Sequence, residues 1–204
     1  MTSAIRNAIA IAAVAALLGA CASKGQPTAQ YDFGPLQQTP ASTQVPAAIG
    51  ALIVADIAGP NALDTERMQY RLLYADARQS RPYAYNQWTA TPFQLMTQRM
   101  KARIAQAGVK VLSTTDAAAS PTVLRMEVND FAQNFDSATS STGVVDLRAS
   151  LFRNHKLVDQ KTFTRSSPAP SPDAAGGAQA LAAATDAVTA DVLAWLATLP
   201  PQKE

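Results

Sequence analysis

The fold is decided by residues 122–165, TVLRMEVNDFAQNFDSATSSTGVVDLRASLFRNHKLVDQKTFTR. Apolar and polar side chains alternate over 123–129, again over 145–151 and again over 157–165. This period of two is typical of half-buried β-strands. Only Asn154-His155 and the adjoining residues separate the last two segments, which predicts a β-hairpin there. The sequence therefore predicts a cluster of strands.

Two helices flank this cluster. The first begins at Thr91-Pro92, since Thr is a favourable N-cap and Pro suits the first helical position. It ends at Gly108, and its apolar residues recur at spacings of three and four: Phe93, Met96, Met100, Ile104 and Ala107. The second begins after Ser171 or Asp173 and ends before Pro200. Its apolar face consists of Leu181, Ala184, Val188, Val192 and Trp195.

Further short strands are expected outside this region. They are 31–35, the apolar run 51–57, the alternating segment 67–74 and the segment 109–112, with loops at 37–50 and 113–120. We expect a β-bulge near Asp130-Phe131, where the alternation shifts. Strands followed and preceded by helices predict an α+β fold: an antiparallel or mixed sheet with two main helices packed on one face.

The composition excludes several classes of protein. The chain has 204 residues, a formal charge of +2, one Cys and one His. One Cys cannot form an internal disulfide, and one Cys with one His cannot form a structural zinc site. The mean hydropathy of −0.03 argues against a polytopic membrane protein. We expect no metal and no cofactor.

The N-terminal segment predicts export. Arg6 precedes an apolar run, and Leu18-Gly19-Ala20-Cys21 closes it with small residues. This motif resembles the lipobox of bacterial lipoproteins, in which the Cys becomes the first residue and is acylated. Simple cleavage with an incidental Cys, or an uncleaved anchor, are the alternatives. We therefore expect a signal peptide at 1–20, acylated Cys21 with a flexible tether at 21–30, and a single domain at 31–204.

No catalytic constellation stands out. His155 lies in the expected hairpin turn, where polar residues are common, and no Ser has a Gly-x-Ser-x-Gly context. Asp130 and Asp136 could form the paired acids of a glycosidase, but fifteen acidic residues produce such spacings by chance. Gly176-Gly177 lacks the rest of a phosphate-binding loop. The sequence predicts a protein that is not an enzyme.

Aromatic and basic residues are mixed in one region, and they are the candidate partner or lipid interface. The candidates are Arg67, Arg71, Tyr83, Tyr85 and Trp88, accompanied by Tyr70, Tyr74, Arg78 and Arg81. Tyr, Trp and Arg are favoured at interfaces. The alternative is that the aromatic side chains pack on the sheet while the arginines stay solvated. Export and a nearly neutral mature chain exclude nucleic acid as a partner.

The order of these segments resembles the ABC-type transport auxiliary lipoprotein family, which includes the PqiC-like lipoproteins. The resemblance rests on pieces spread along nearly the whole mature chain. They are Cys21, Tyr31-Asp32-Phe33-Gly34-Pro35, Leu52-Ile53-Val54, Arg67-Met68-Gln69-Tyr70-Arg71, Tyr85 with Trp88, the helix from Pro92, Val128-Asn129-Asp130-Phe131, the strand at 145–152, and Trp195-Leu196.

The resemblance implies a non-catalytic accessory of an ABC or Mce-type lipid transport system, docking the periplasmic end of its conduit. The implied partners are an Mce-domain protein, the outer membrane through acyl chains, and phospholipid; a homo-oligomer is left open. Ala22 rather than Asp follows the cysteine, which by similarity to enteric sorting rules favours the outer membrane, facing the periplasm. The alternative is a stand-alone envelope lipoprotein that binds peptidoglycan or another envelope polymer.

Overall fold

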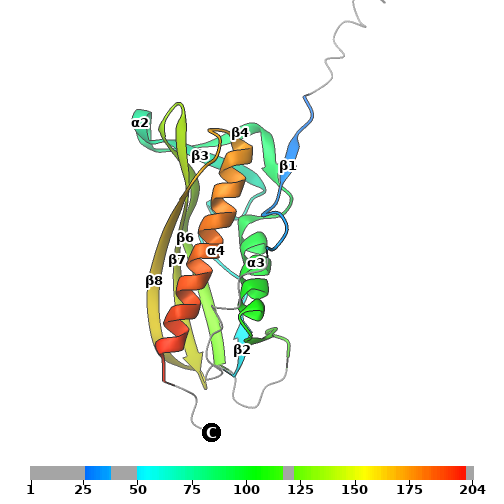
Figure 1. The fold of residues 1–204 in the computed structure, drawn as a ribbon, viewed down its shortest axis with the longest axis vertical. Helices are drawn as coiled ribbons and strands as arrows, with labels where there is room; N and C mark the ends of the chain where they lie inside the picture. Colours follow the sequence, from blue (N-terminus) through cyan, green and yellow to red (C-terminus); the bar gives the residue numbers. More distant parts are fainter. Residues whose placement is uncertain (1–25, 38–49, 117–121, 201–204) are drawn as a thin grey trace, which may run out of the picture.

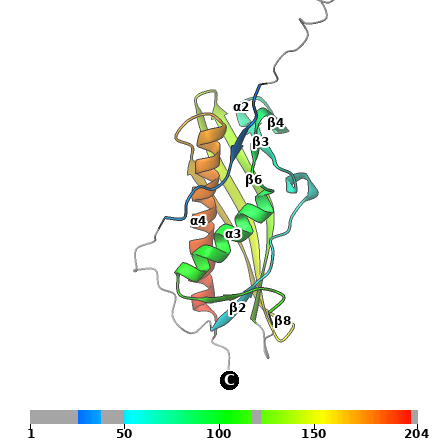
Figure 2. The ribbon, with the colours of Figure 1, turned by 90° about the vertical axis from the view of Figure 1, so that its right-hand side faces the viewer.

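A computed structural model describes residues 26–37, 50–116 and 122–200. Within them an eight-stranded mixed sheet carries the two long helices on one face, so the expected α+β class is confirmed (Figures 1 and 2). The strands are β1 (Ala29–Tyr31), β2 (Ala51–Val54), β3 (Arg67–Leu72), β4 (Ala77–Trp88), β5 (Lys110–Leu112), β6 (Thr122–Ser137), β7 (Ser140–Arg153) and β8 (Lys156–Pro168). The helices are the 3-10 helix η3 (Asn61–Leu63), α2 (Leu73–Asp76), α3 (Pro92–Gln106) and α4 (Ala174–Thr198).

The long meander of β6, β7 and β8 is the frame of the sheet. All its pairings are antiparallel, and β6 pairs with β7 over nearly its whole length. The register shifts between Val128 and Asp130, which confirms the expected bulge. Asn154 and His155 connect β7 to β8 with φ of 48° and 63°, the left-handed backbone that a two-residue hairpin turn requires.

The remaining strands attach to the free edge of β6 at two separate places. β2 pairs in parallel with its beginning, Thr122–Leu124, and β3 pairs in parallel with 133–135. β5 then lies parallel beside β2, while β4 lies antiparallel beside β3 and carries β1 at its outer edge. The sheet is therefore mixed, and β6 is the one strand that holds both attachments.

Several predicted boundaries are wrong. The segment 67–74 leaves the strand at Leu72 and forms α2, and the following polar, Pro-containing residues, for which no strand is expected, form the twelve-residue strand β4. Pro82 is tolerated because β1 pairs with β4 only at 86–88, so this part of β4 is an edge. The first strand is Ala29–Tyr31 rather than 31–35, and β2 ends at Val54.

Both long helices are as predicted. Thr91 and Gln94 form a capping box at the start of α3, and Asp173 caps α4 by accepting a hydrogen bond from the amide of Gly176. The apolar stripe of α3 and that of α4 are buried against the sheet and against each other. Gly143 of β7 allows α4 to approach, because a Cβ there would lie 2.6 Å from the amide nitrogen of Leu181.

Helix α4 is also long and apolar enough to cross a membrane by length and composition, the one such helix in the described residues. However, 61% of its most apolar window is buried inside the domain. Its hydropathy is therefore that of a core helix, which covers β7 and β8.

Candidate interaction surface

The five predicted interface residues all lie on β3 and β4, the antiparallel pair that α2 connects. Arg67 is exposed, and Tyr85 keeps 50% of its surface. The two lie close to each other along the pair, since Arg67 is opposite Gln87, two residues beyond Tyr85. These two side chains are the part of the predicted set that a partner could reach.

Arg71 is occupied by an ion pair. Its two terminal guanidinium nitrogens donate to the two carboxylate oxygens of Asp130, each at 2.9 Å. A bidentate pair of this kind holds two planar groups in one orientation. It fastens β3 to β6 just before these strands begin to pair in parallel, and it engages Asp130, one of the two acids considered for a glycosidase.

Tyr83 takes part in a buried polar network. Its hydroxyl donates to Oε1 of Gln133 at 2.9 Å, and Nε2 of Gln133 donates to Ser141 Oγ at 2.8 Å and to the carbonyl of Asp173 at 3.0 Å. Burial raises the pKa of Tyr83, with smaller contributions from Tyr70 and Asp173, so its hydroxyl stays a neutral donor. The ring also packs on Tyr70 at 4.6 Å between centroids.

Trp88 belongs to the core. Only 2% of its surface is exposed, and its ring contacts Phe33 and Phe131, each at 5.8 Å between centroids. The structure thus divides the predicted set into two exposed residues, two residues that fix the pair of strands to the rest of the sheet, and one core residue.

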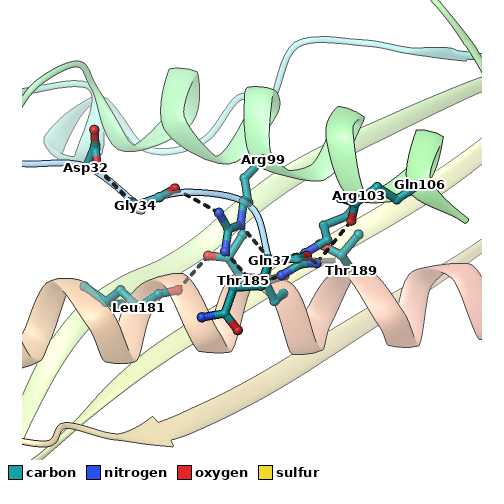
Figure 3. A network of polar contacts seen from close by, with 10 residues as sticks. Asp32, Gly34, Gln37, Arg99, Arg103, Gln106, Leu181, Thr185 and Thr189 are labelled. Carbon is teal, nitrogen blue, oxygen red and sulfur yellow. Dashed lines mark hydrogen bonds and ion pairs between the residues drawn. The ribbon is translucent and has the colours of Figure 1, made fainter. Parts of the chain in front are cut away.

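Sequence reasoning missed a dense polar cluster between α3 and α4 (Figure 3). Arg99 and Arg103 of α3 both converge on Asp186 of α4 through four hydrogen bonds of 2.6–2.9 Å. The same guanidinium groups donate to the carbonyls of Gly34, at 3.1 Å, and Gln37, at 2.6 Å. We call these five residues the arginine clasp. It binds the segment after β1 to both helices.

The charged side chains of the clasp are largely buried, so each charge needs an oppositely charged partner. The side chains of Arg99, Arg103 and Asp186 are 9%, 14% and 23% exposed. Burial alone would raise the pKa of Asp186, but the hydrogen bonds from Arg103 and Arg99 outweigh it and hold that pKa below its ordinary value. The pKa of Arg103 is raised by its hydrogen bond to Asp186. Both partners are therefore charged. A sequence signal existed only in part: the arginines are one helical turn apart, but their acid lies far along the chain.

Two open grooves flank the segment after β2. One, of about 550 Å³, runs beside the start of α3. It is lined mostly by carboxylate, amide and hydroxyl side chains around Phe93: Asp56, Asn61, Asp64, Thr91, Gln94, Thr97 and Gln98. The other, of about 440 Å³, lies over β6 and β7, where Arg148 is paired with Glu127 and Arg125 lies over the ring of Phe152. Among the described residues no cluster of His, Cys, Asp and Glu could hold a metal ion.

The other sequence-based candidates lie elsewhere. His155 is exposed in the β7–β8 turn, and Asp136 is exposed at the end of β6. Cys21 and the expected signal peptide at 1–20 lie outside the described residues.

Comparison with known proteins adds a family and a fold. The model of the ABC-type transport auxiliary lipoprotein component family matches residues 31–193. The crystal structure of protein XCC0632 from Xanthomonas campestris has a TM-score of 0.67 at 21% identity, covering 82% of this chain and 94% of its own. The crystal structure of an uncharacterized protein has a TM-score of 0.66 at 16% identity, covering 83% and 99%. At these identities the two structures show the fold alone. A search of curated proteins gives no match.

Proposed function

Because the chain belongs to the ABC-type transport auxiliary lipoprotein component family, we propose that it is a periplasmic lipoprotein anchored in the outer membrane, and a non-catalytic accessory of an ABC/Mce-type lipid transport system. The observation that supports this proposal is the extent of the family match, which runs from the last residue of β1 into α4 and includes every strand from β2 to β8.

The anchor is the first part of the proposal. We place a signal peptide at 1–20, acyl chains on Cys21, a tether at 21–30 and the functional domain at 31–204. Each buried acyl methylene contributes about 0.8 kcal/mol, so a cysteine with several chains stays on its membrane. A Cys21→Ser variant should therefore leave the outer-membrane fraction. If it stays there, the acylation proposal is wrong.

The docking surface is the second part. Arg67 and Tyr85 project from a strand pair that the Arg71–Asp130 ion pair and the Tyr83–Gln133 hydrogen bond hold rigidly on β6. Exposed Tyr and Arg are favourable contact residues, and a backbone that is already held in place needs little further ordering on binding. We propose that they contact an Mce-domain protein at the periplasmic end of its conduit.

Site-specific photocrosslinking tests this surface. A photoreactive residue is placed at Tyr85 in one strain and at Leu157 in another, because the two side chains are similarly exposed, at 50% and 53%. Mass spectrometry of native envelopes should identify an Mce-domain protein crosslinked from position 85 and not from position 157. Equal capture from both positions, or no capture although the partner is present, would refute the docking surface.

One observation favours the second candidate, a stand-alone binder of peptidoglycan or another envelope polymer. The groove beside α3 offers amide, hydroxyl and carboxylate groups around an aromatic side chain, which suits a polysaccharide. Co-sedimentation with purified sacculi distinguishes this candidate. This candidate would be established if the protein binds sacculi, if Gln98→Ala weakens that binding, and if position 85 captures no Mce-domain protein.

A further inference from the structure

Exposed large apolar side chains are distributed unevenly over the described residues. There are four of them, and three belong to the β3–α2–β4 hairpin: Leu73, Tyr74 and Tyr85. Leu73 and Tyr74 begin α2 with 39% and 54% of their surfaces exposed, and α2 contains no buried residue. The fourth, Leu157, follows the turn between β7 and β8, at the opposite end of the molecule (Figure 2). The α2 end therefore carries apolar surface that the domain does not use.

The charges around this surface cancel. Asp76 and Arg78 form an ion pair at 3.4 Å, and the Arg78 side chain is 95% exposed. The end of β6 lies against α2 and adds the exposed carboxylate of Asp136, and Arg81 on β4 adds a cation. A neutral surface with two protruding apolar side chains, rimmed by charges of both signs, suits a layer of phospholipid headgroups. Tyr is a residue that favours this interface, and a long Arg side chain can keep its charge in the headgroup layer.

The chain reaches the domain from this same end. In both views the segment that enters β1 comes from the end that carries α2 (Figures 1 and 2). Its course is fixed, because β1 pairs with β4 at 86–88 and the amide of Thr89 donates to the carbonyl of Tyr31 at 2.8 Å. Beyond β1 the arginine clasp holds Gly34 and Gln37. The tether therefore departs from the domain at a fixed position.

The length of the tether limits the distance to the bilayer. From Cys21 to Ala29 the chain advances by eight residues, which span at most about 29 Å when fully extended. An anchor on Cys21 therefore pulls the α2 end toward the membrane and leaves the β7–β8 turn pointing away. We propose that Leu73, Tyr74 and Arg78, together the tip surface, contact the phospholipid surface of the membrane that holds Cys21. This inference rests on the proposed acylation.

Tryptophan reporters in the acylated full chain test the contact. Leu73→Trp and Leu157→Trp replace two exposed leucines at opposite ends, and the native Trp88 and Trp195 are buried, so the unmutated chain gives the background. Each protein is reconstituted in phosphatidylcholine vesicles, with and without bromine on the acyl chains. Brominated chains should quench the added emission of Leu73→Trp and leave that of Leu157→Trp unchanged. Adding phosphatidylglycerol should alter neither result, since Asp76 and Asp136 balance the charges of Arg78 and Arg81 around the tip surface.

The outcomes separate this inference from the proposed function. If both proteins stay on the vesicles and neither reporter is quenched, or both are quenched alike, the tip surface is not the membrane contact although the anchor is. If position 73 is unquenched and a photoreactive residue there captures an envelope protein, the tip surface binds a protein. If the chain does not stay on the vesicles, the acylation fails and this inference fails with it. Circular dichroism checks that both variants keep the fold.

Discussion

Replacing Asp186 by alanine should destabilise the protein strongly, because it leaves Arg99 and Arg103 facing each other without their shared acceptor. Removing one partner of a buried ion pair costs about 3–5 kcal/mol. The 23% exposure of Asp186 admits some water, so we expect the lower end of this range, about 3 kcal/mol. With a urea m value of about 2 kcal/mol/M, the unfolding midpoint should fall by about 1.5 M.

A matched control is available on the outer face of the sheet. Glu127 pairs with Arg148 there, and their side chains are 50% and 43% exposed. Exposed pairs of this kind contribute less than about 1 kcal/mol, so Glu127→Ala should barely move the urea midpoint. If Asp186→Ala shifts the midpoint no more than Glu127→Ala does, the clasp does not stabilise the fold and the reasoning is wrong.

The pH dependence gives a second measurement on the same carboxylate. Because the pKa of Asp186 is lower in the folded than in the unfolded protein, the unfolded state binds a proton first as the pH falls. The stabilisation is complete above the ordinary Asp pKa of about 3.9, and it is lost as the pH falls below that value toward the folded-state pKa. The difference in unfolding free energy between the unmutated chain and Asp186→Asn should therefore shrink only below about pH 4. A difference that stays constant down to pH 2 would contradict this assignment.

Four further substitutions test individual positions. Gly177→Ala should lower the unfolding free energy by about 1–3 kcal/mol, because a Cβ there would lie 2.0 Å from Gln133 Oε1. This cost should exceed the gain from the better helix propensity of Ala. A higher melting temperature in calorimetry would contradict the prediction. His155→Gly should stabilise the protein by up to about 1 kcal/mol in urea unfolding, since the φ of 63° at this position favours Gly. The variant should still complement a deletion strain; lost complementation would indicate a role for the imidazole. Trp88→Ala should cost about 3–5 kcal/mol, whereas Tyr85→Ala should change stability by less than about 0.5 kcal/mol and reduce only partner capture.

Much of the fold could be predicted where the pattern is local. The strands of the β6–β7–β8 meander contain the alternating segments 123–129, 145–151 and 157–165. The two long helices combine a cap with an apolar stripe, so each of these elements has a signal in its own local sequence. Strand β4 was missed because its residues are polar and include Pro82, which an edge position tolerates and a central strand would not. The parallel pairing of β2 and β3 with β6 could not be predicted either, because the register between distant strands depends on packing rather than on local pattern.

The candidate surface could be predicted only as a region. Composition placed Arg67, Arg71, Tyr83, Tyr85 and Trp88 together, and the structure shows that they share one strand pair. Their exposures differ because neighbours from elsewhere in the chain determine them. Asp130 forms an ion pair with Arg71, Gln133 accepts a hydrogen bond from Tyr83, and the ring of Phe131 packs on Trp88. The arginine clasp depends on Asp186, 87 residues after Arg99, and no single-sequence pattern joins such residues.

The β3–α2–β4 hairpin could serve a membrane and a protein partner at once because its two exposed sections are separate. The tip surface lies at α2, whereas Arg67 and Tyr85 lie near the other end of the strand pair, opposite Gln87 and beside β1. Between them Arg71 and Tyr83 fasten the hairpin to β6, so a single strand pair that is bonded to the central sheet carries both sections. A partner docked at Tyr85 would then sit at a fixed height from the bilayer. Under the proposed function, such a fixed height is what this auxiliary component would supply to its transport system.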